Sequence, residues 1–310
     1  FTRLLTDTSA NARLYAYATA FNAGVRFEAN SGLLHLVNNT QVGDQSRFVI
    51  QSGHLKVDSH VVGNVTQYFH YRGTYSGRAA VTFPPDCTFE WREGVIYGAS
   101  TDGDLVLTNN ASKPALWHWT NRKYIRGGRT IYNRGQLNYN GEWLYFRDNS
   151  HFVNEAGAVL RVGIGSNRHA WFGQETSNQQ SFVTRGFTNL GDVHVVITPG
   201  YWFHIETRLW HAPGARWYIH TGRTVLRSRY SVGGGTLDGA FFMSNSTILR
   251  AEYANYHMSY DAAALAADPQ SVGFHGIGGD DGSGGERCWD CHLQLWTSRF
   301  ELCNTTRGFD

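Results

Sequence analysis

The chain has 310 residues, of which 27 are basic and 25 acidic, giving a formal net charge of +2 at pH 7. A charge so close to neutral excludes the strong positive field with which many nucleic-acid-binding proteins attract their partners. No stretch approaches the roughly 20 apolar residues of a membrane-spanning helix, so no membrane span is expected. The length suffices for one elongated β domain with a sizeable core.

Cysteines and glycosylation sequons both indicate an oxidising environment outside the cytosol. The cysteines form an even set that predicts structural disulfides, namely Cys87, Cys288, Cys291 and Cys303. Five Asn-x-Ser/Thr sequons predict N-glycans at Asn38, Asn64, Asn110, Asn245 and Asn304. The chain begins at Phe1 without a methionine, as a processed or partial chain would. We therefore expect a secreted, extracellular glycoprotein.

Residues 1–29 lack the repeated motif that follows them, and we expect them to cap the open end of the domain. Residues 8–21 leave two interpretations open. Ser9 or Asn11 could begin a helix. A strand is favoured instead by alternating residues, namely Tyr15, Tyr17, Thr19 and Phe21.

Between residues 30 and 257 one short motif recurs, a Gly or Asn corner followed by alternating apolar residues. Its clearest copies begin at Asn133 and Asn154, about 21 residues apart. Gly and Asn tolerate the backbone conformation of a tight corner, and this lag is typical of a chain wound into a coil. The pattern predicts a β-solenoid of about ten rungs, stacked at ~4.8 Å. An ordinary β-sandwich with glycine-rich turns is the alternative.

Residues 258–310 differ in composition from the repeat. Asp261–Asp268 predicts a short helix, and residues 276–285 predict a flexible loop. Asp280 and Asp281 in that loop lack the spacing of an EF-hand, so solvated carboxylates are a better interpretation than a Ca²⁺ site. Three of the four cysteines follow or flank this loop, which predicts a disulfide-stapled C-terminal cap.

Aromatic residues gather in clusters along the predicted coil. Inside the coil such rings would form core, whereas outside they would suit a glycan-stacking platform or a subunit interface. The candidates for the second role are Trp117, Trp119, Trp143, Trp171, Trp202 and Trp217. All basic residues except three lysines are arginines, whose planar fork suits carboxylates and sulfates, although genome composition explains the excess equally well.

The densest basic patch, residues 117–129, offers the only catalytic candidates. An enzyme that removes the proton beside a uronate carboxylate needs a base and a neighbouring cation, for which Lys123, Arg126 and His118 are suited. An outward loop with solvated charges is the competing interpretation. A serine nucleophile elbow, a P-loop, an HExxH helix and a dinucleotide fingerprint are absent.

The cornered short strands at a lag of about 21 residues resemble the right-handed parallel β-helix proteins of the pectate-lyase-like superfamily over residues 30–257. The resemblance implies the fold but no activity. Of the motifs of the polygalacturonase branch, only Asp280-Asp281 and Phe274-His275-Gly276 have counterparts, in the wrong order and in the tail. The motifs of the pectate lyases are absent.

We therefore expect an all-β, single-stranded parallel β-helix with an N-terminal cap and a disulfide-stapled C-terminal cap. The expected function is that of a secreted, glycosylated structural subunit that self-associates through its ends or flanks into a filament, coat or matrix. A lyase, hydrolase or binding protein for an acidic polysaccharide is the alternative. A phage-type trimeric spike is less compatible with sequons and disulfides. The sequence implies no cofactor or metal and leans against an enzyme.

Overall fold

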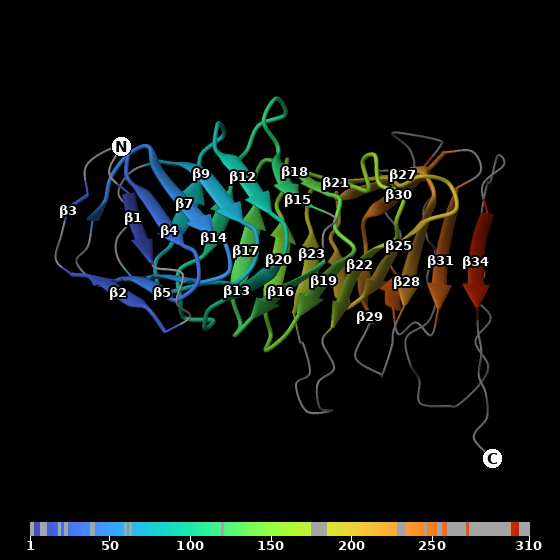
Figure 1. Cartoon of the computed structure of the whole chain (residues 1–310). Helices are drawn as coiled ribbons and strands as arrows, with labels where there is room; N and C mark the ends of the chain where they lie inside the picture. Colours follow the sequence, from blue (N-terminus) through green and yellow to red (C-terminus); the bar gives the residue numbers. More distant parts are fainter. Residues whose placement is uncertain are drawn as a thin grey trace, which may run out of the picture.

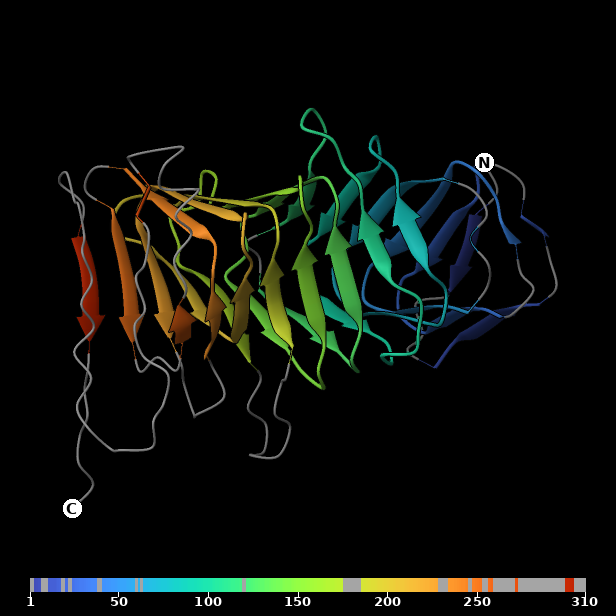
Figure 2. The same ribbon diagram turned by 180° about the vertical axis from the view of Figure 1, so that it is seen from behind.

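The computed structural model describes most of the chain between Arg3 and Cys303. The described residues are 3–6, 11–17, 20–21, 24–37, 41–58, 61, 64–118, 121–174, 185–227, 234–244, 247–252, 256–258, 271–272 and 299–303. They form a rod in which successive coils stack along one axis (Figures 1 and 2). The predicted parallel β-solenoid is thereby confirmed, and the described part of the chain contains no helix. None of its elements is therefore a helix able to span a membrane.

Three long sheets run along the rod, and we call the first of them sheet 1. Its strands, in spatial order, are β1 (Arg3–Thr6), β4 (Arg26–Ala29), β7 (Ser46–Ile50), β9 (Val65–His70), β12 (Thr88–Trp91), β15 (Ala115–Trp117), β18 (Gln136–Tyr139), β21 (Val159–Val162), β24 (Asp192–Val196), β27 (Arg216–Thr221), β30 (Ala240–Met243) and β33 (Ser271–Val272). All neighbours are parallel except β30 and β33, which pair antiparallel.

Sheet 2 also has twelve strands, all parallel. They are β2 (Arg13–Ala16), β5 (Leu33–Leu36), β8 (His54–Val57), β10 (Thr74–Ser76), β13 (Gly94–Tyr97), β16 (Arg122–Arg126), β19 (Trp143–Phe146), β22 (Ala170–Gln174), β25 (Trp202–Glu206), β28 (Arg223–Arg227), β31 (Ile248–Glu252) and β34 (Arg299–Cys303).

Sheet 3 has eight strands and begins later in the chain. They are β11 (Val81–Phe83), β14 (Leu105–Leu107), β17 (Thr130–Asn133), β20 (His151–Asn154), β23 (Gly186–Asn189), β26 (Arg208–His211), β29 (Gly234–Leu237) and β32 (Tyr256–Met258). A short pair, β3 (Ala20–Phe21) and β6 (Gln41–Val42), lies near the N-terminal end.

The number of residues in one coil varies along the chain. In the early coils Phe27 pairs with Phe48 and Phe48 with Tyr68, steps of 21 and 20 residues. Later, Val193 pairs with Trp217 and Trp217 with Phe241, steps of 24 residues. The third strand alone does not lengthen a coil, because Ala115 pairs with Leu137, a step of 22 residues, across a coil that contains β16 and β17.

A column of glycines accounts for the recurring corner in the first half of the chain. Gly32, Gly53, Gly73 and Gly94 each precede or begin a strand of sheet 2 and stack on successive rungs. A Cβ atom at Gly32 would clash with the carbonyl oxygen of Ala12 on the preceding rung, and each later glycine meets the backbone of the glycine before it in the same way. Only glycine permits this close approach of two backbones.

The solenoid begins earlier than the sequence predicted. β1 pairs in register with β4, and β2 with β5, so both strands belong to the first rung rather than to a separate cap. The alternation around Tyr15 belongs to the strand β2, not to a helix. Ala12 stands at this corner in place of glycine, opposite Gly32 on the next rung.

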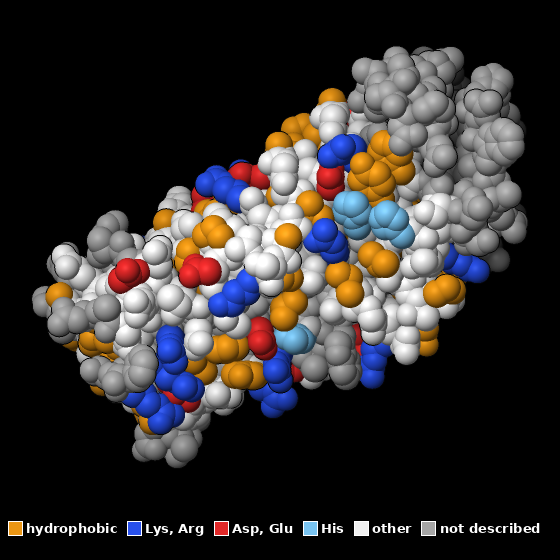
Figure 3. Space-filling view, turned by 90° about the horizontal axis from the view of Figure 1, so that it is seen from above, with side chains coloured by type: hydrophobic (Ala, Val, Ile, Leu, Met, Phe, Trp, Pro, Cys, Tyr) orange, Lys and Arg blue, Asp and Glu red, His pale blue; other side chains and the backbone are white. Residues whose placement is uncertain are grey.

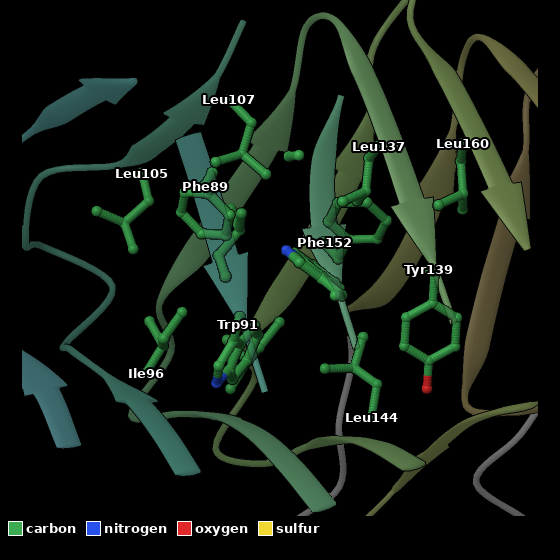
Figure 4. Packing of buried hydrophobic residues seen from close by; sticks show 14 of the residues in the cluster. Phe89, Trp91, Ile96, Leu105, Leu107, Leu137, Tyr139, Leu144, Phe152 and Leu160 are labelled. Carbon is green, nitrogen blue, oxygen red and sulfur yellow. The ribbon is translucent and has the colours of Figure 1, made fainter. Parts of the chain in front are cut away.

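The interior of the coil is filled by side chains that alternate inward along each strand. Trp91 packs on Trp117, with ring centroids 5.2 Å apart, and Trp117 packs on Phe152 at 5.1 Å. Figure 4 shows Trp91 and Phe152 among the side chains of this interior. Trp217 lies in the same interior, 5.8 Å from Phe241. Trp117 and Trp217 are fully buried, so the prediction that they form an interface or glycan platform is wrong.

A buried asparagine ladder runs along one interior corner of sheet 3. Asn133 donates to the Oδ1 atom of Asn154 at 2.8 Å, and Asn154 donates to that of Asn189 at 2.7 Å. Asn189 then lies 3.0 Å from Nδ1 of His211. All four side chains are fully buried. The two clearest copies of the sequence motif therefore begin at consecutive members of this ladder.

Cys87 does not form the predicted disulfide. It is a free cysteine in the core, and burial raises the pKa of its thiol to about 12. Cys87 directly precedes β12, the fifth strand of sheet 1, whereas Cys303 ends β34, the twelfth strand of sheet 2. At ~4.8 Å per strand they lie roughly 30 Å apart, far beyond the ~7 Å limit between bridged Cα atoms.

The predicted C-terminal cap is only partly described. β34 pairs with β31, so the last described strand extends sheet 2. Cys288 and Cys291, the helix predicted for Asp261–Asp268 and the loop predicted for residues 276–285 lie outside the described residues. The disulfide staple therefore stays a prediction for these cysteines.

Candidate functional site

A groove of about 590 Å³ lies on sheet 3, over its middle strands. Its volume falls within the range of about 300–1,000 Å³ that is usual for ligand sites. The side chains that give it chemical character are Tyr132, His151, Arg185, Thr188, Arg208 and Trp210. They come from β17, β20, β23 and β26 and from the residue directly before β23. Successive coils of the solenoid thus assemble the groove from residues far apart in the sequence.

Trp210 presents its ring to solvent in this groove. Alternation along β26 directs Arg208 and Trp210 outward and the intervening Leu209 inward. On the neighbouring rungs Trp210 pairs with Thr188 and Thr236, which are too small to cover an indole. Trp210 is 47% exposed. An aromatic face is therefore available to a ligand.

The described lining of the groove carries positive charge only. Arg185 and Arg208 are exposed and contribute two cationic guanidinium groups, whereas no Asp or Glu lines the groove. Burial, and then Arg185, lowers the pKa of His151 to about 4, so this imidazole is neutral near pH 7. Burial, Asp104 and Glu155 raise the pKa of Tyr132.

His151 is positioned by a hydrogen bond to its neighbour on the next coil. Its Nε2 atom lies 2.8 Å from the hydroxyl oxygen of Thr188. Because Thr188 also pairs with Trp210, this contact fixes the floor of the groove beside the exposed indole. The groove therefore combines an apolar ring face, neutral hydrogen-bonding groups and two cations.

The second aromatic surface, which we call the sheet 2 strip, has a different geometry. It consists of Tyr124, Trp143, Tyr145, Trp171, Trp202 and His204. Trp143 stacks on Trp171 with centroids 4.1 Å apart and planes 8° apart, and Trp171 stacks on His204 at 4.8 Å and 4°. The Arg223 guanidinium covers Trp202 at 5.0 Å.

The rings of the sheet 2 strip therefore cover one another's faces. Both faces of Trp171 are occupied, by Trp143 on one rung and His204 on the other. All three side chains remain partly or wholly buried, so solvent meets ring edges rather than faces. Trp143, Trp171 and Trp202 lie on the outer face of sheet 2, but their stacking leaves little room for a sugar to lie flat on them.

The structure does not bring the three predicted catalytic side chains together. Alternation along β16 turns Lys123 into the core and Arg126 outward, where its guanidinium lies 4.6 Å from the Tyr124 ring. The Lys123 ammonium donates to the backbone carbonyl of His118, whose ring lies 3.3 Å from the Glu90 carboxylate. Burial lowers the pKa of Lys123 to about 7. A fully buried lysine cannot reach a polymeric substrate, so the catalytic arrangement is not supported.

Two of the five predicted glycosylation sites can be placed. Asn64 and Asn110 are exposed, as an acceptor must be. The Oδ1 atom of Asn110 accepts hydrogen bonds from Ser112 at 2.7 Å and from the Lys113 amide at 2.9 Å, which places it in an exposed turn. The other three sites, Asn38, Asn245 and Asn304, and also Trp119, lie outside the described residues. Glycosylation stays a prediction.

Comparison of the chain with protein-family models, with curated proteins and with solved structures gives no significant match. Among the described side chains, no group of three or more His, Cys, Asp and Glu is arranged to hold a metal ion. The groove on sheet 3 is therefore assessed on its own geometry. Sequence reasoning missed its three most distinctive residues, Arg185, Arg208 and Trp210.

Proposed function

We propose that the protein binds an acidic polysaccharide in the groove on sheet 3. The observation that carries this proposal is the exposed face of Trp210 between two threonines. The apolar face of a sugar ring can pack on an indole, because tryptophan combines a large apolar surface with a rigid plane. A groove that runs across several coils suits an extended chain better than a compact molecule.

The charge of the groove favours an anionic ligand. Arg185 and Arg208 can each form paired hydrogen bonds to a carboxylate or a sulfate. The proposal is restricted to binding, because two-carboxylate glycoside hydrolysis needs a pair of Asp or Glu residues and the described lining has none. His151 and Tyr132 are suited to hydrogen-bond sugar hydroxyls.

Trp210→Ala is expected to weaken binding of a polyuronate oligosaccharide by roughly tenfold to a hundredfold, measured by titration calorimetry. Loss of the stacked ring and its buried apolar area is worth about 1.4–2.8 kcal/mol. Tyr97→Ala is the matched control, since Tyr97 is 49% exposed on another sheet. Equal losses in the two variants would rule out a specific role for the groove.

The choice of ligand is tested by comparing a polyuronate, a sulfated glycan and a neutral glucan on the same protein. Arg208→Gln should weaken binding of both anionic ligands and reduce their salt dependence, while leaving any affinity for the glucan unchanged. If the protein bound the glucan and the polyuronate with equal affinity, the groove would still be a sugar site, but its preference for acidic glycans would be overturned.

The sheet 2 strip favours a second candidate function, that of a structural subunit. Rings on four successive strands present their edges as a continuous, partly apolar surface, which suits association with a second copy of the chain. Electron microscopy of the protein as isolated from its source should then show regular filaments or sheets. Dispersed monomers at high concentration would exclude this function without affecting the glycan proposal.

A further inference from the structure

Two histidines on the outer face of sheet 1 direct ring nitrogens towards each other. The Nδ1 atom of His194 lies 2.9 Å from the Nε2 atom of His220, and the two rings are 7° from parallel. This face is seen in Figure 3, where histidine side chains lie together beside hydrophobic and basic ones. His220 is exposed and His194 is half-buried, so the facing nitrogens can be reached from solvent.

An irregularity in the strand pairing creates this contact. Val195 pairs with Ile219 but Val196 pairs with Thr221, so His220 is the extra residue of a β-bulge. Bulges redirect side chains and are frequent beside functional sites. The bulge shifts His220 along its strand towards His194, on the same outer face of the sheet.

Stacking holds the His194 ring in place. It lies 4.6 Å from the Tyr218 ring at 15°, and Tyr218 lies 4.7 Å from Phe242 at 17°. Such a stack restricts rotation of the imidazole without occupying its ring nitrogens. The His194 ring is thus held in place before any ligand arrives.

The surroundings of His194 favour the neutral form of its imidazole. Burial, and then His220 and Arg161, lower the pKa of His194. Asp192 and Arg216 form a two-bond ion pair at 2.8 and 2.9 Å and largely neutralise each other. Arg161 donates to Gln136 on the opposite side, away from β27.

We propose that His194 and His220 form a two-imidazole site for a divalent transition-metal cation, with Cu²⁺ preferred. Two nitrogens bound to one ion at about 2.0 Å are separated by roughly 2.8–3.3 Å in square-planar or tetrahedral geometry, and the observed separation is 2.9 Å. The ring centroids are 5.2 Å apart, so the two nitrogens point at each other, and a rotation of the exposed His220 ring is needed before their lone pairs converge on one ion. The imidazole that donates the N–H···N bond moves its proton to its other ring nitrogen, so both facing nitrogens offer lone pairs. Water completes the coordination on the exposed side.

The test is a Cu²⁺ titration of the whole chain by calorimetry, with electron paramagnetic resonance of the bound ion. The wild-type protein should bind one Cu²⁺ with a signal from two nitrogens. His194→Gln and His220→Gln should each weaken this binding roughly tenfold or more. The double variant should bind Cu²⁺ no more weakly than either single variant, because loss of one imidazole already removes the two-nitrogen coordination.

His35→Gln serves as the control, since His35 is a surface histidine bonded to Asp58 and distant from the pair. It should bind Cu²⁺ like the wild-type protein. Two outcomes would overturn the proposal: unchanged binding in the double variant, or independent, additive losses from the two single substitutions. Circular dichroism of each variant checks that the fold persists, which is expected because His220 is exposed.

Discussion

Asn154→Ala is expected to lower the free energy of unfolding by about 2–5 kcal/mol. Asn154 is the central member of the buried ladder, accepting from Asn133 and donating to Asn189 and to the Asp192 carbonyl. Alanine leaves a donor of Asn133 and an acceptor of Asn189 buried without partners. Each such unsatisfied group costs about 1–3 kcal/mol, which is more than the hydrogen bond itself contributes.

Chemical denaturation followed by circular dichroism measures this effect. Asn138→Ala is the control, because Asn138 lies on the outer face of β18 and takes no part in the ladder. Its expected cost is within about 0.5 kcal/mol of zero. If the two variants lost the same stability, the ladder would contribute no more than a surface asparagine.

Lys123→Met is expected to stabilise the protein, by on the order of 3 kcal/mol near pH 6. The Lys123 ammonium is fully buried, and burial lowers its pKa from 10.5 to about 7. Methionine fills a similar volume without a charge. The gain is partly offset because the His118 carbonyl loses its hydrogen-bond donor.

The pH dependence distinguishes this mechanism from better packing. Between about pH 7 and 10.5 the unfolded chain holds a proton on Lys123 that the folded protein has released, so wild-type stability rises with pH. The advantage of Lys123→Met should therefore fall by about 2–3 kcal/mol between about pH 6 and pH 9, which is most of its value. Denaturation at both pH values measures this, with the exposed Lys113→Met as control. If the difference in stability between Lys123→Met and the wild-type protein did not change with pH, the buried charge would not be its cause.

The fold was predictable because its repeat has a local physical cause. Gly32 and its counterparts are required wherever one backbone crosses closely over the rung before it, and Asn133 and Asn154 are required to continue a buried ladder. Both constraints make Gly or Asn recur at regular intervals in the sequence. The first rung was missed because Ala12 stands at its corner in place of glycine.

The groove was not predictable because it depends on which residues become neighbours on adjacent coils. Trp210 is exposed because Thr188 and Thr236 lie beside it, whereas Trp171 is covered because Trp143 and His204 lie beside it. These neighbours are separated by different numbers of residues, set by loops of different length. A tryptophan flanked by small residues on both neighbouring coils is the signal to seek once the register is known.

The alternation of side chains along each strand decided which of the other predicted residues face the core and which face solvent. Trp117 and Lys123 lie in the same basic and aromatic segment, yet both alternate into the core, whereas Arg126 alternates outward. A shift of one residue in the expected register reverses every such assignment. The sequence shows that side chains alternate along a strand. When both alternating sets of positions contain aromatic residues, it does not show which set faces the core.

The crystal structure of the protein soaked with a short polyuronate tests the central claim most directly. We expect a sugar ring packed on the exposed face of Trp210, with its carboxylates directed to Arg185 and Arg208. An empty groove at saturating ligand, or a ligand bound on the sheet 2 strip instead, would contradict the assignment of the groove as the glycan site.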